Sequence, residues 1–273
     1  MNYDKLKNTE LFLFDMDGTL YLGDNVYEGA VELMEDLPRL GKKYIYLTNN
    51  SSRAGEDYIT RLRRLGFPCK RENVFTSGMA TGMYLNQRHP GAKVYLAGTK
   101  AFYRELVSYG IDLVNDELGH TESEDVDVVV QGFDTELVYE KLDKAVHFLR
   151  RGAHFIAANP DWVCPTWYGS VPDCGSVCEM LYRATKRRPV VIGKPQSAMV
   201  EIALERTGCR KEETVIVGDR LYTDIACGVN AGIDSVFVLS GEGTEADIET
   251  YHIHPTWVFP NIGTMYRQLE DKI

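Results

Sequence analysis

Short apolar runs recur along the chain, and most of them are continuous rather than alternating with polar residues. Strands that are buried on both faces, as in parallel sheets, have this pattern. Nine runs predict such strands: LFLF (11–14), YIYL (44–47), VYLA (94–97), VDVVV (126–130), FIAA (155–158), VVI (190–192), VIV (215–217), VFVL (236–239) and WVF (257–259).

Amphipathic stretches between these runs predict helices, and several of them close on Gly, as helix C-termini often do. They are GAVELMEDLPRLG (29–41), EDYITRLRRLG (56–66), ELVYEKLDKAVHFLRRG (136–152), QSAMVEIALERTG (196–208) and TDIACGVNAG (223–232). Strands and helices in alternation give right-handed crossovers and a mostly parallel sheet, so the predicted fold class is α/β.

The middle of the chain is predicted to form a second domain. Residues 94–158 hold three strand candidates with helices between them, and turn-rich stretches flank this part at TSGMATG (76–82) and YGSVPDCGS (168–176). We therefore expect an inserted domain at residues 81–179, with residues 1–80 and 180–273 forming the other domain.

Composition and charge exclude some classes of partner. With 273 residues, 44% of them hydrophobic, the chain can bury a sizeable core. Its 40 acidic residues outnumber its 30 basic ones, and we find no concentrated basic run, so nucleic acid is not an expected partner. The polar N-terminus and the short apolar runs predict neither a signal peptide nor a membrane span.

The six cysteines lack the dense spacing of a secreted disulfide scaffold, which favours a reducing cytoplasm. Cys174 and Cys178 form a C-x3-C pair, but a zinc site needs further ligands at suitable spacing, so we interpret them as structural thiols. His252 and His254 form an H-x-H pair, which in isolation is more typical of solvated or capping groups.

Polar residues directly follow four of the predicted strands, at the edge where ligands bind to open parallel sheets. They are Asp15 after LFLF, Thr48, Asn49 and Asn50 after YIYL, Lys194 after VVIG, and Asp219 after VIVG, with Asp224 five residues later. Each alone could be a helix cap or a turn residue. Together they predict one site at one edge of a sheet.

Carboxylates, a lysine and a hydroxyl in one site are suited to phosphoryl transfer. Crowded carboxylates need a cation, and an oxygen-rich site favours Mg²⁺. A lysine and a hydroxyl can bind the remaining phosphate oxygens, and an Asp carboxylate can serve as the nucleophile. We therefore expect a small phosphorylated metabolite as substrate.

Four motifs in this order resemble those of the haloacid dehalogenase (HAD) superfamily: DMDGT (15–19), the strand-terminal Thr48, Lys194 in GKP, and GDRLYTD (218–224). LTNNSS (47–52), AANPD (157–161) and DCGSVCE (173–179) are similar to its subfamily IIA, the NagD and p-nitrophenyl phosphatase type. The resemblance implies a Rossmann-like doubly wound parallel sheet with an inserted α/β cap of the C2 type. Relatives often pair through their caps, so a homodimer is the expected assembly.

The resemblance also implies roles for the two acids of DMDGT. Asp15 is the expected nucleophile and a Mg²⁺ ligand. Asp17 is the expected general acid and base, with its backbone carbonyl on the metal. A carboxylic acid at this second position can protonate a leaving alkoxide and later activate water. It therefore favours hydrolysis of a phosphate ester over dehalogenation.

The other motifs complete the implied site. Thr48 holds the phosphate through its hydroxyl, and Lys194 neutralises charge between Asp15 and the phosphate. Asp219 binds Mg²⁺, and Asp224 supports the metal site. Tyr222 stands where relatives often carry Asp, Asn or Glu, which argues against a polar supporting role at that position.

Substrate contacts are expected from the cap and from the end of one strand. By analogy, Asn159, Asp161 and the loop from Cys164 to Gly175 approach the leaving group, while Asn49 and Asn50 line the core side. Asn-Pro-Asp is equally a good turn sequence.

The predicted function is hydrolysis of a small phosphate monoester through an aspartyl-phosphate: a sugar phosphate, a nucleoside monophosphate, phosphoglycolate or p-nitrophenyl phosphate. One alternative is a non-catalytic sensor that binds a phosphorylated metabolite. Another is an NAD(P)-binding oxidoreductase, because GEGTEA (241–246) fits G-x-G-x-x-[GA] after a strand. Only ten residues separate Ala246 from Trp257, which leaves too little chain for the crossover helix that this motif requires.

Overall fold

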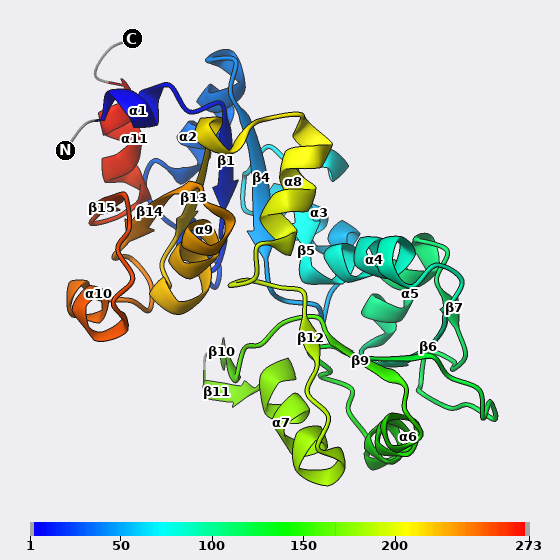
Figure 1. The fold of residues 1–273 in the computed structure, drawn as a ribbon. Helices are drawn as coiled ribbons and strands as arrows, with labels where there is room; N and C mark the ends of the chain where they lie inside the picture. Colours follow the sequence, from blue (N-terminus) through cyan, green and yellow to red (C-terminus); the bar gives the residue numbers. More distant parts are fainter. Residues whose placement is uncertain (1–2, 167, 271–273) are drawn as a thin grey trace. The chain divides into compact units, whose positions relative to one another are not determined.

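The computed structural model describes residues 3–166 and 168–270, and its contacts divide the chain into two compact units (Figure 1). The first unit comprises the residues up to Thr48, Tyr58–Phe75 and the residues from Lys194 onward. The second comprises Asn49–Asp57 and Thr76–Gly193. Within the described residues, no helix combines the length and apolar character that crossing a membrane requires.

A six-stranded sheet forms the centre of the first unit, in the order β15-β14-β13-β1-β4-β5 (Figure 1). From β1 the chain adds β4 and β5 on one side, then returns to add β13, β14 and β15 on the other, so the order reverses between β1 and β13. The parallel pairing of β1 with both β4 and β13 confirms the predicted doubly wound α/β fold. The strands are β1 (Leu11–Phe14), β4 (Lys43–Thr48), β5 (Val74–Thr76), β13 (Thr214–Gly218), β14 (Asp234–Val238) and β15 (Trp257–Phe259).

Helices cover this sheet, and their apolar faces join its core. On α2, for example, Leu33, Met34 and Leu37 are buried with the side chains of β1 and β4. The helices are α1 (Asp4–Lys7), α2 (Ala30–Arg39), α3 (Gly55–Arg64), α8 (Ala198–Thr207), α9 (Ala226–Ala231), α10 (Glu245–Tyr251) and α11 (Ile262–Glu270). Shorter elements are the β2 (Tyr21–Leu22) and β3 (Asn25–Val26) hairpin, 3-10 turns at Arg71–Asn73 and Lys211–Glu213, and a π-helical turn at Leu221–Ile225.

The second unit has its own five-stranded parallel sheet, in the order β12-β9-β8-β6-β7. Its strands are β6 (Lys93–Ala97), β7 (Asp112–Leu113), β8 (Val128–Gln131), β9 (His154–Ala157) and β12 (Val190–Val191). Its helices are α4 (Ser77–Arg88), α5 (Lys100–Ser108), α6 (Tyr139–Arg150) and α7 (Cys174–Thr185), and β10 (Val163–Thr166) pairs with β11 (Gly169–Pro172) in a hairpin. Each of the nine predicted strands is present in one of the two sheets.

The stretches interpreted as turn-rich are mostly regular structure, so the predicted domain limits at 80/81 and 179/180 fall inside α4 and α7. In TSGMATG, Thr76 caps α4 by accepting from the amide of Met79. The glycines of this stretch allow close helix packing rather than a turn. A Cβ on Gly82 would lie 2.9 Å from the ring of Tyr109, and one on Gly78 would lie 3.2 Å from the ring of Phe102.

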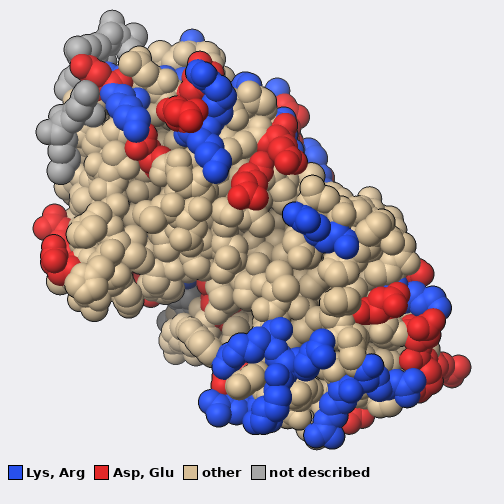
Figure 2. Space-filling view, viewed as in Figure 1, with Lys and Arg blue, Asp and Glu red and all other residues tan. Residues whose placement is uncertain are grey.

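Basic residues gather on one surface of the second unit, contrary to the expectation that none are concentrated locally (Figure 2). Arg183 and Arg188 both pair with Glu179, and Arg188 lies 3.8 Å from the ring centre of Tyr182. Short runs at the ends of α6 and α7 supply the rest of the cluster: Arg150 donates to the carbonyl of Ala184, and Arg187 to that of Ala153. Each run is short in the sequence, and the packing of the two helix ends brings them together.

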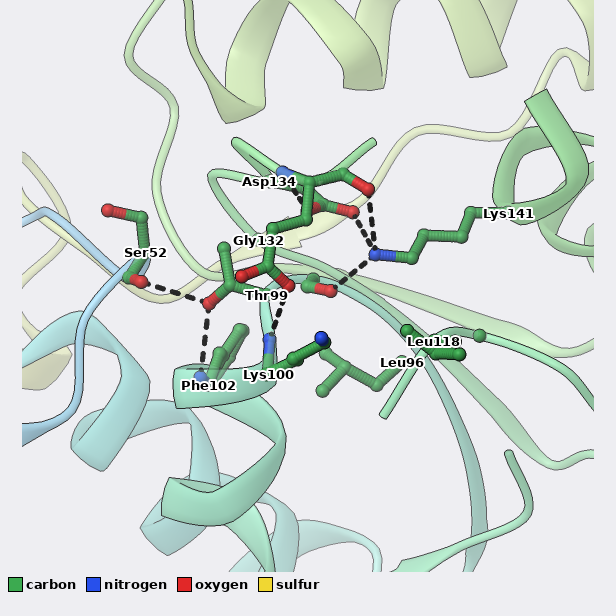
Figure 3. A network of polar contacts seen from close by, with 12 residues as sticks. Ser52, Leu96, Thr99, Lys100, Phe102, Leu118, Gly132, Asp134 and Lys141 are labelled. Atoms are coloured by element: carbon green, nitrogen blue, oxygen red, sulfur yellow. Dashed lines mark hydrogen bonds and ion pairs between the residues drawn. The ribbon is translucent and has the colours of Figure 1, made fainter. Parts of the chain in front are cut away.

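The point where strand order reverses in the second sheet, between β6 and β8, is filled by a polar network (Figure 3). The Thr99 hydroxyl donates to the carbonyl of Ser52 and caps α5. Lys141 Nζ lies 2.8 Å from both Asp134 Oδ2 and the carbonyl oxygen of Gly98. The network therefore ties the segment Asn49–Asp57 to the sheet, which explains why that segment belongs to the second unit.

We expect Lys141→Met to destabilise the second unit by about 3–5 kcal/mol, because it leaves the buried carboxylate of Asp134 without its counter-charge. Both side chains are almost fully buried, at 2% and 0% exposure. Urea unfolding measures the loss, and Lys100→Met, which removes an exposed lysine from the same region, is the control. Equal stability of the two variants would show that the ion pair contributes nothing.

Among the described residues, neither the cysteine pair 174/178 nor the histidine pair 252/254 belongs to a cluster of three or more potential metal ligands. The six cysteines are thiols rather than disulfides, and Cys174 and Cys178 are buried with their sulfur atoms 3.9 Å apart. His252 is the C-cap of α10, in the left-handed region. Among residues 3–166 and 168–270, the sole group of three or more potential ligands is a carboxylate cluster elsewhere in the first unit.

Candidate active site

Asp15 and Asp219 lie side by side where the strand order of the first sheet reverses. Asp15 directly follows β1, and Asp219 directly follows β13. The two strands pair in parallel with Phe14 opposite Val217, and the Asp15 amide donates to the carbonyl of Val217 at 2.8 Å. Carboxyl ends of neighbouring strands at such a reversal form the usual ligand-binding crevice of this fold.

Three carboxylates converge there, from Asp15, Asp219 and Asp224. One oxygen of each lies within 4.8 Å of the others. Burial raises the pKa of Asp15 well above its usual value, and the neighbouring carboxylates raise it further, whereas Lys194 lowers it. Burial and the charge of Asp224 raise the pKa of Asp219 to about 6. Three carboxylates held this close are strongly disfavoured as anions unless a cation compensates them.

Lys194 supplies one positive charge to this cluster. Its Nζ lies 2.5 Å from Asp15 Oδ1 and 2.7 Å from Asp224 Oδ1, and it donates to the carbonyl of Leu47. Burial alone would lower its pKa, but the two carboxylates raise it above the usual value. The lysine is therefore a fixed ammonium beside the expected nucleophile.

Gly18 and Thr19 complete the DMDGT turn by packing against Asp219. Gly18 has a φ of +93°, and a Cβ there would lie 2.4 Å from Asp219 Oδ2. The hydroxyl of Thr19 donates to Asp219 Oδ1 at 3.4 Å. Glycine is required here for both its backbone conformation and its lack of a side chain.

The side chain of Asp17 lies outside the carboxylate cluster and is 54% exposed. Arg61 Nη2 on α3 approaches its Oδ1 at 3.9 Å, and the Arg61 guanidinium also lies over the ring of Tyr21. Separation from the cluster leaves Asp17 available for proton transfer. Arg61 could not be predicted from the sequence, because no strand-end or motif rule covers a residue inside α3.

The loop after β14 wraps around Asp219 and was not predicted as part of the site. The amide of Glu242 donates to Asp219 Oδ2 at 2.8 Å, and a Cβ on Gly241 would lie 1.9 Å from that oxygen. Ser240 donates to the carbonyl of Gly18. The glycines of GEGTEA (241–246) are thus explained by contact with Asp219 rather than by a dinucleotide. The strand-end rule, applied to VFVL, would have found this loop.

Thr48 is buried at the end of β4, and the division between the two units falls immediately after it. Among the other predicted substrate residues, Asn49 Nδ2 lies 3.1 Å from Asp161 Oδ1, and Asn159 Nδ2 donates to the carbonyl of Asn49. Asn50 accepts from both the amide and the hydroxyl of Ser52. These contacts join Asn49, Asn159 and Asp161 in one polar cluster of the second unit, while Asn50 closes a local turn.

The matches to known proteins agree on one family. Residues 12–112 match the model of haloacid dehalogenase-like hydrolases, and residues 191–265 match a HAD-hydrolase-like model. An acid sugar phosphatase of Staphylococcus aureus is 35% identical over 265 residues, which cover 97% of this chain and all of that protein.

Solved structures agree with these matches. A 4-nitrophenylphosphatase from Thermotoga maritima is 39% identical with a TM-score of 0.89, over 96% of this chain and 98% of that one. The glycerol phosphate phosphatase of Mycobacterium tuberculosis, solved in complex with calcium, is 32% identical with a TM-score of 0.84, over 97% of this chain and 76% of that one.

Proposed function

This chain belongs to the haloacid dehalogenase superfamily, in its NagD and p-nitrophenyl phosphatase group, and we propose that it hydrolyses small phosphate monoesters with Mg²⁺ through an aspartyl-phosphate. Its activity class is phosphoric monoester hydrolase. The observation that carries the proposal is the convergence of Asp15, Asp219 and Asp224 with Lys194 at one strand-order reversal.

The carboxylate cluster fits a hard divalent cation. Its donors are all oxygens, the set that Mg²⁺ prefers, and burial together with the neighbouring carboxylates raises the pKa values of Asp15 and Asp219 even beside Lys194, which supports a cation at this cluster. Asp15, Asp219 and the backbone carbonyl of Asp17 would hold the ion, with Asp224 supporting them. When bound, the ion supplies charge compensation to the carboxylates and to the phosphate oxygens.

In the proposed reaction, a carboxylate oxygen of Asp15 attacks phosphorus, and the ester P–O bond breaks. Asp17 gives its proton to the leaving oxygen. It then accepts a proton from water, whose oxygen attacks the phosphorus of the aspartyl-phosphate, releasing phosphate and the free carboxylate of Asp15. Thr48 and Lys194 bind phosphate oxygens throughout, and the ammonium of Lys194 offsets their charge.

The second unit is proposed to act as the cap that selects the leaving group. The names of relatives support sugar phosphates, glycerol phosphate and p-nitrophenyl phosphate as candidates, beside the nucleoside monophosphates and phosphoglycolate expected from the sequence. Six scattered cysteines without disulfides favour a cytoplasmic location, and a homodimer through this unit is the proposed assembly.

Release of phosphate from p-nitrophenyl phosphate and a panel of phosphorylated metabolites tests this function. We expect turnover that needs added Mg²⁺ and stops with a chelator. Tight binding of a phosphorylated metabolite without turnover of any ester would instead support the non-catalytic sensor.

We expect Asp161→Asn to change the ratio of kcat/KM between two sugar phosphates by about 10-fold, because a polar contact to a substrate group discriminates between substrates that have and lack that group. The carboxylate of Asp161 lies beside Asn49, and its amide donates to Asn159. The Mg²⁺ dependence should stay as in the wild type. Asp125→Asn, at an exposed acid of the same unit, is the control, and an unchanged substrate ranking would remove Asp161 from the substrate site.

A further inference from the structure

Building on the proposed metal-dependent function, we propose that Glu242 is a positioning residue that holds the metal-binding carboxylate of Asp219 in place, and that Tyr222 and Arg220 secure it. This assigns a role to the loop after β14 and to the Tyr in the fourth motif.

The backbone of the loop fixes Asp219 from one side. The Glu242 amide donates to Asp219 Oδ2 at 2.8 Å, and the Gly243 amide donates to the carbonyl of Asp219 at 3.0 Å. At the other carboxylate oxygen, Thr19 donates to Oδ1 at 3.4 Å. The direction of the carboxylate therefore depends on where the loop holds its amide groups.

The loop needs glycine on both sides of Glu242. A Cβ on Gly241 would lie 1.9 Å from Asp219 Oδ2, and one on Gly243 would lie 2.6 Å from the carbonyl oxygen of Asp219. Two glycines leave the segment with more backbone freedom than other residues would. Contacts made by the side chain of Glu242 restrain this segment and so limit its backbone freedom.

The side chain of Glu242 is held at both carboxylate oxygens. The Tyr222 hydroxyl donates to Oε1 at 2.6 Å, and Arg220 Nε forms an ion pair with Oε2 at 2.9 Å. Arg220 directly follows Asp219 in the chain, and Tyr222 lies two residues beyond Arg220, so these contacts join the two segments that meet at Asp219. Although the residue type argues against a polar supporting role at position 222, the Tyr222 hydroxyl reaches Glu242 from the neighbouring turn.

A surface ion pair with no positioning role would affect metal binding differently from the proposed positioning residues. Exposed pairs contribute little to stability, so removing one should leave metal binding unchanged. Residues that orient a metal ligand typically change metal affinity by 10- to 100-fold when they are removed, about the effect expected here. The affinity for the metal ion, measured without substrate, therefore distinguishes a positioning residue from a surface ion pair.

The test is titration of the metal-free protein with Mn²⁺, followed by electron paramagnetic resonance. We expect Glu242→Ala and Tyr222→Phe to weaken Mn²⁺ binding by about 10-fold, with Tyr222→Phe leaving net charge unchanged. Glu242→Gln keeps an acceptor for the tyrosine and should retain most of the affinity. In turnover, the variants should need more Mg²⁺ and reach a similar kcat at saturation.

Glu179→Ala is the matched control, since Glu179 also pairs with arginines but belongs to the second unit. Wild-type Mn²⁺ affinity in both Glu242→Ala and Tyr222→Phe would overturn the proposal. If the wild-type protein bound no Mn²⁺, the proposed function would fail and this inference with it.

Discussion

Replacing Asp15 with Asn is expected to lower kcat on every phosphate ester by about 10⁴-fold or more, because an amide oxygen is too weak a nucleophile to attack phosphorus. Asn has nearly the same shape, and Lys194 keeps its ion pair with Asp224 in the variant. The fold should therefore persist. Steady-state release of phosphate measures the loss, and a thermal melt checks the fold.

Asp24→Asn is the matched control for this change. Asp24 is an exposed acid of the same unit, paired with Arg64. Its variant should turn over at the wild-type rate. Steady-state hydrolysis by Asp15→Asn within about 10-fold of the wild type would refute Asp15 as the nucleophile, since general acid–base and electrostatic effects alone cannot replace a missing covalent step.

Replacing Asp17 with Asn is expected to slow turnover by about 10²- to 10⁴-fold, the usual contribution of a general acid and base. The size should depend on the leaving group. p-Nitrophenolate leaves without a proton, so its displacement from phosphorus by Asp15 should stay fast, while hydrolysis of the aspartyl-phosphate lacks a base for water. Stopped-flow absorbance should show a burst of p-nitrophenolate equal to the enzyme concentration.

Alkyl phosphates should show no such burst, because their leaving oxygen needs the proton of Asp17. Arg61→Lys provides a comparison, since it changes the cation beside Asp17 without removing the carboxyl group. Equal losses on aryl and alkyl phosphates in Asp17→Asn would contradict the role of general acid.

Much of the fold could be predicted because its strands are buried on both faces. LFLF and VIV read as continuous apolar runs, and both are central strands of the first sheet. The strand-end rule then located Asp15 and Asp219, since it depends only on chain direction and parallel pairing. Lys194 follows β12, a strand of the second sheet, so the prediction that its strand shares a sheet with the strands before Asp15 and Asp219 was wrong, although Lys194 does reach Asp15. These residues lie far apart in the sequence, and the fold brings their charges together.

Other features could not be predicted because they depend on tertiary contact. Gly78 and Gly82 predict a turn by local preference, but the rings of Phe102 and Tyr109 pack against them in a helix. Arg61 reaches Asp17 through the packing of α3. In the same way, Tyr222 finds its acceptor on a loop twenty residues away in the sequence.

The most direct test of the central claim is to identify the phosphorylated residue. Asp17→Asn is mixed with p-nitrophenyl phosphate and Mg²⁺, and the acyl phosphate is reduced with borohydride, which converts a phosphorylated Asp to homoserine. Peptide mass spectrometry then locates the change. We predict homoserine at position 15 in an amount that matches the burst. A burst with no homoserine at position 15, or with a modification at another residue, would contradict the proposed mechanism.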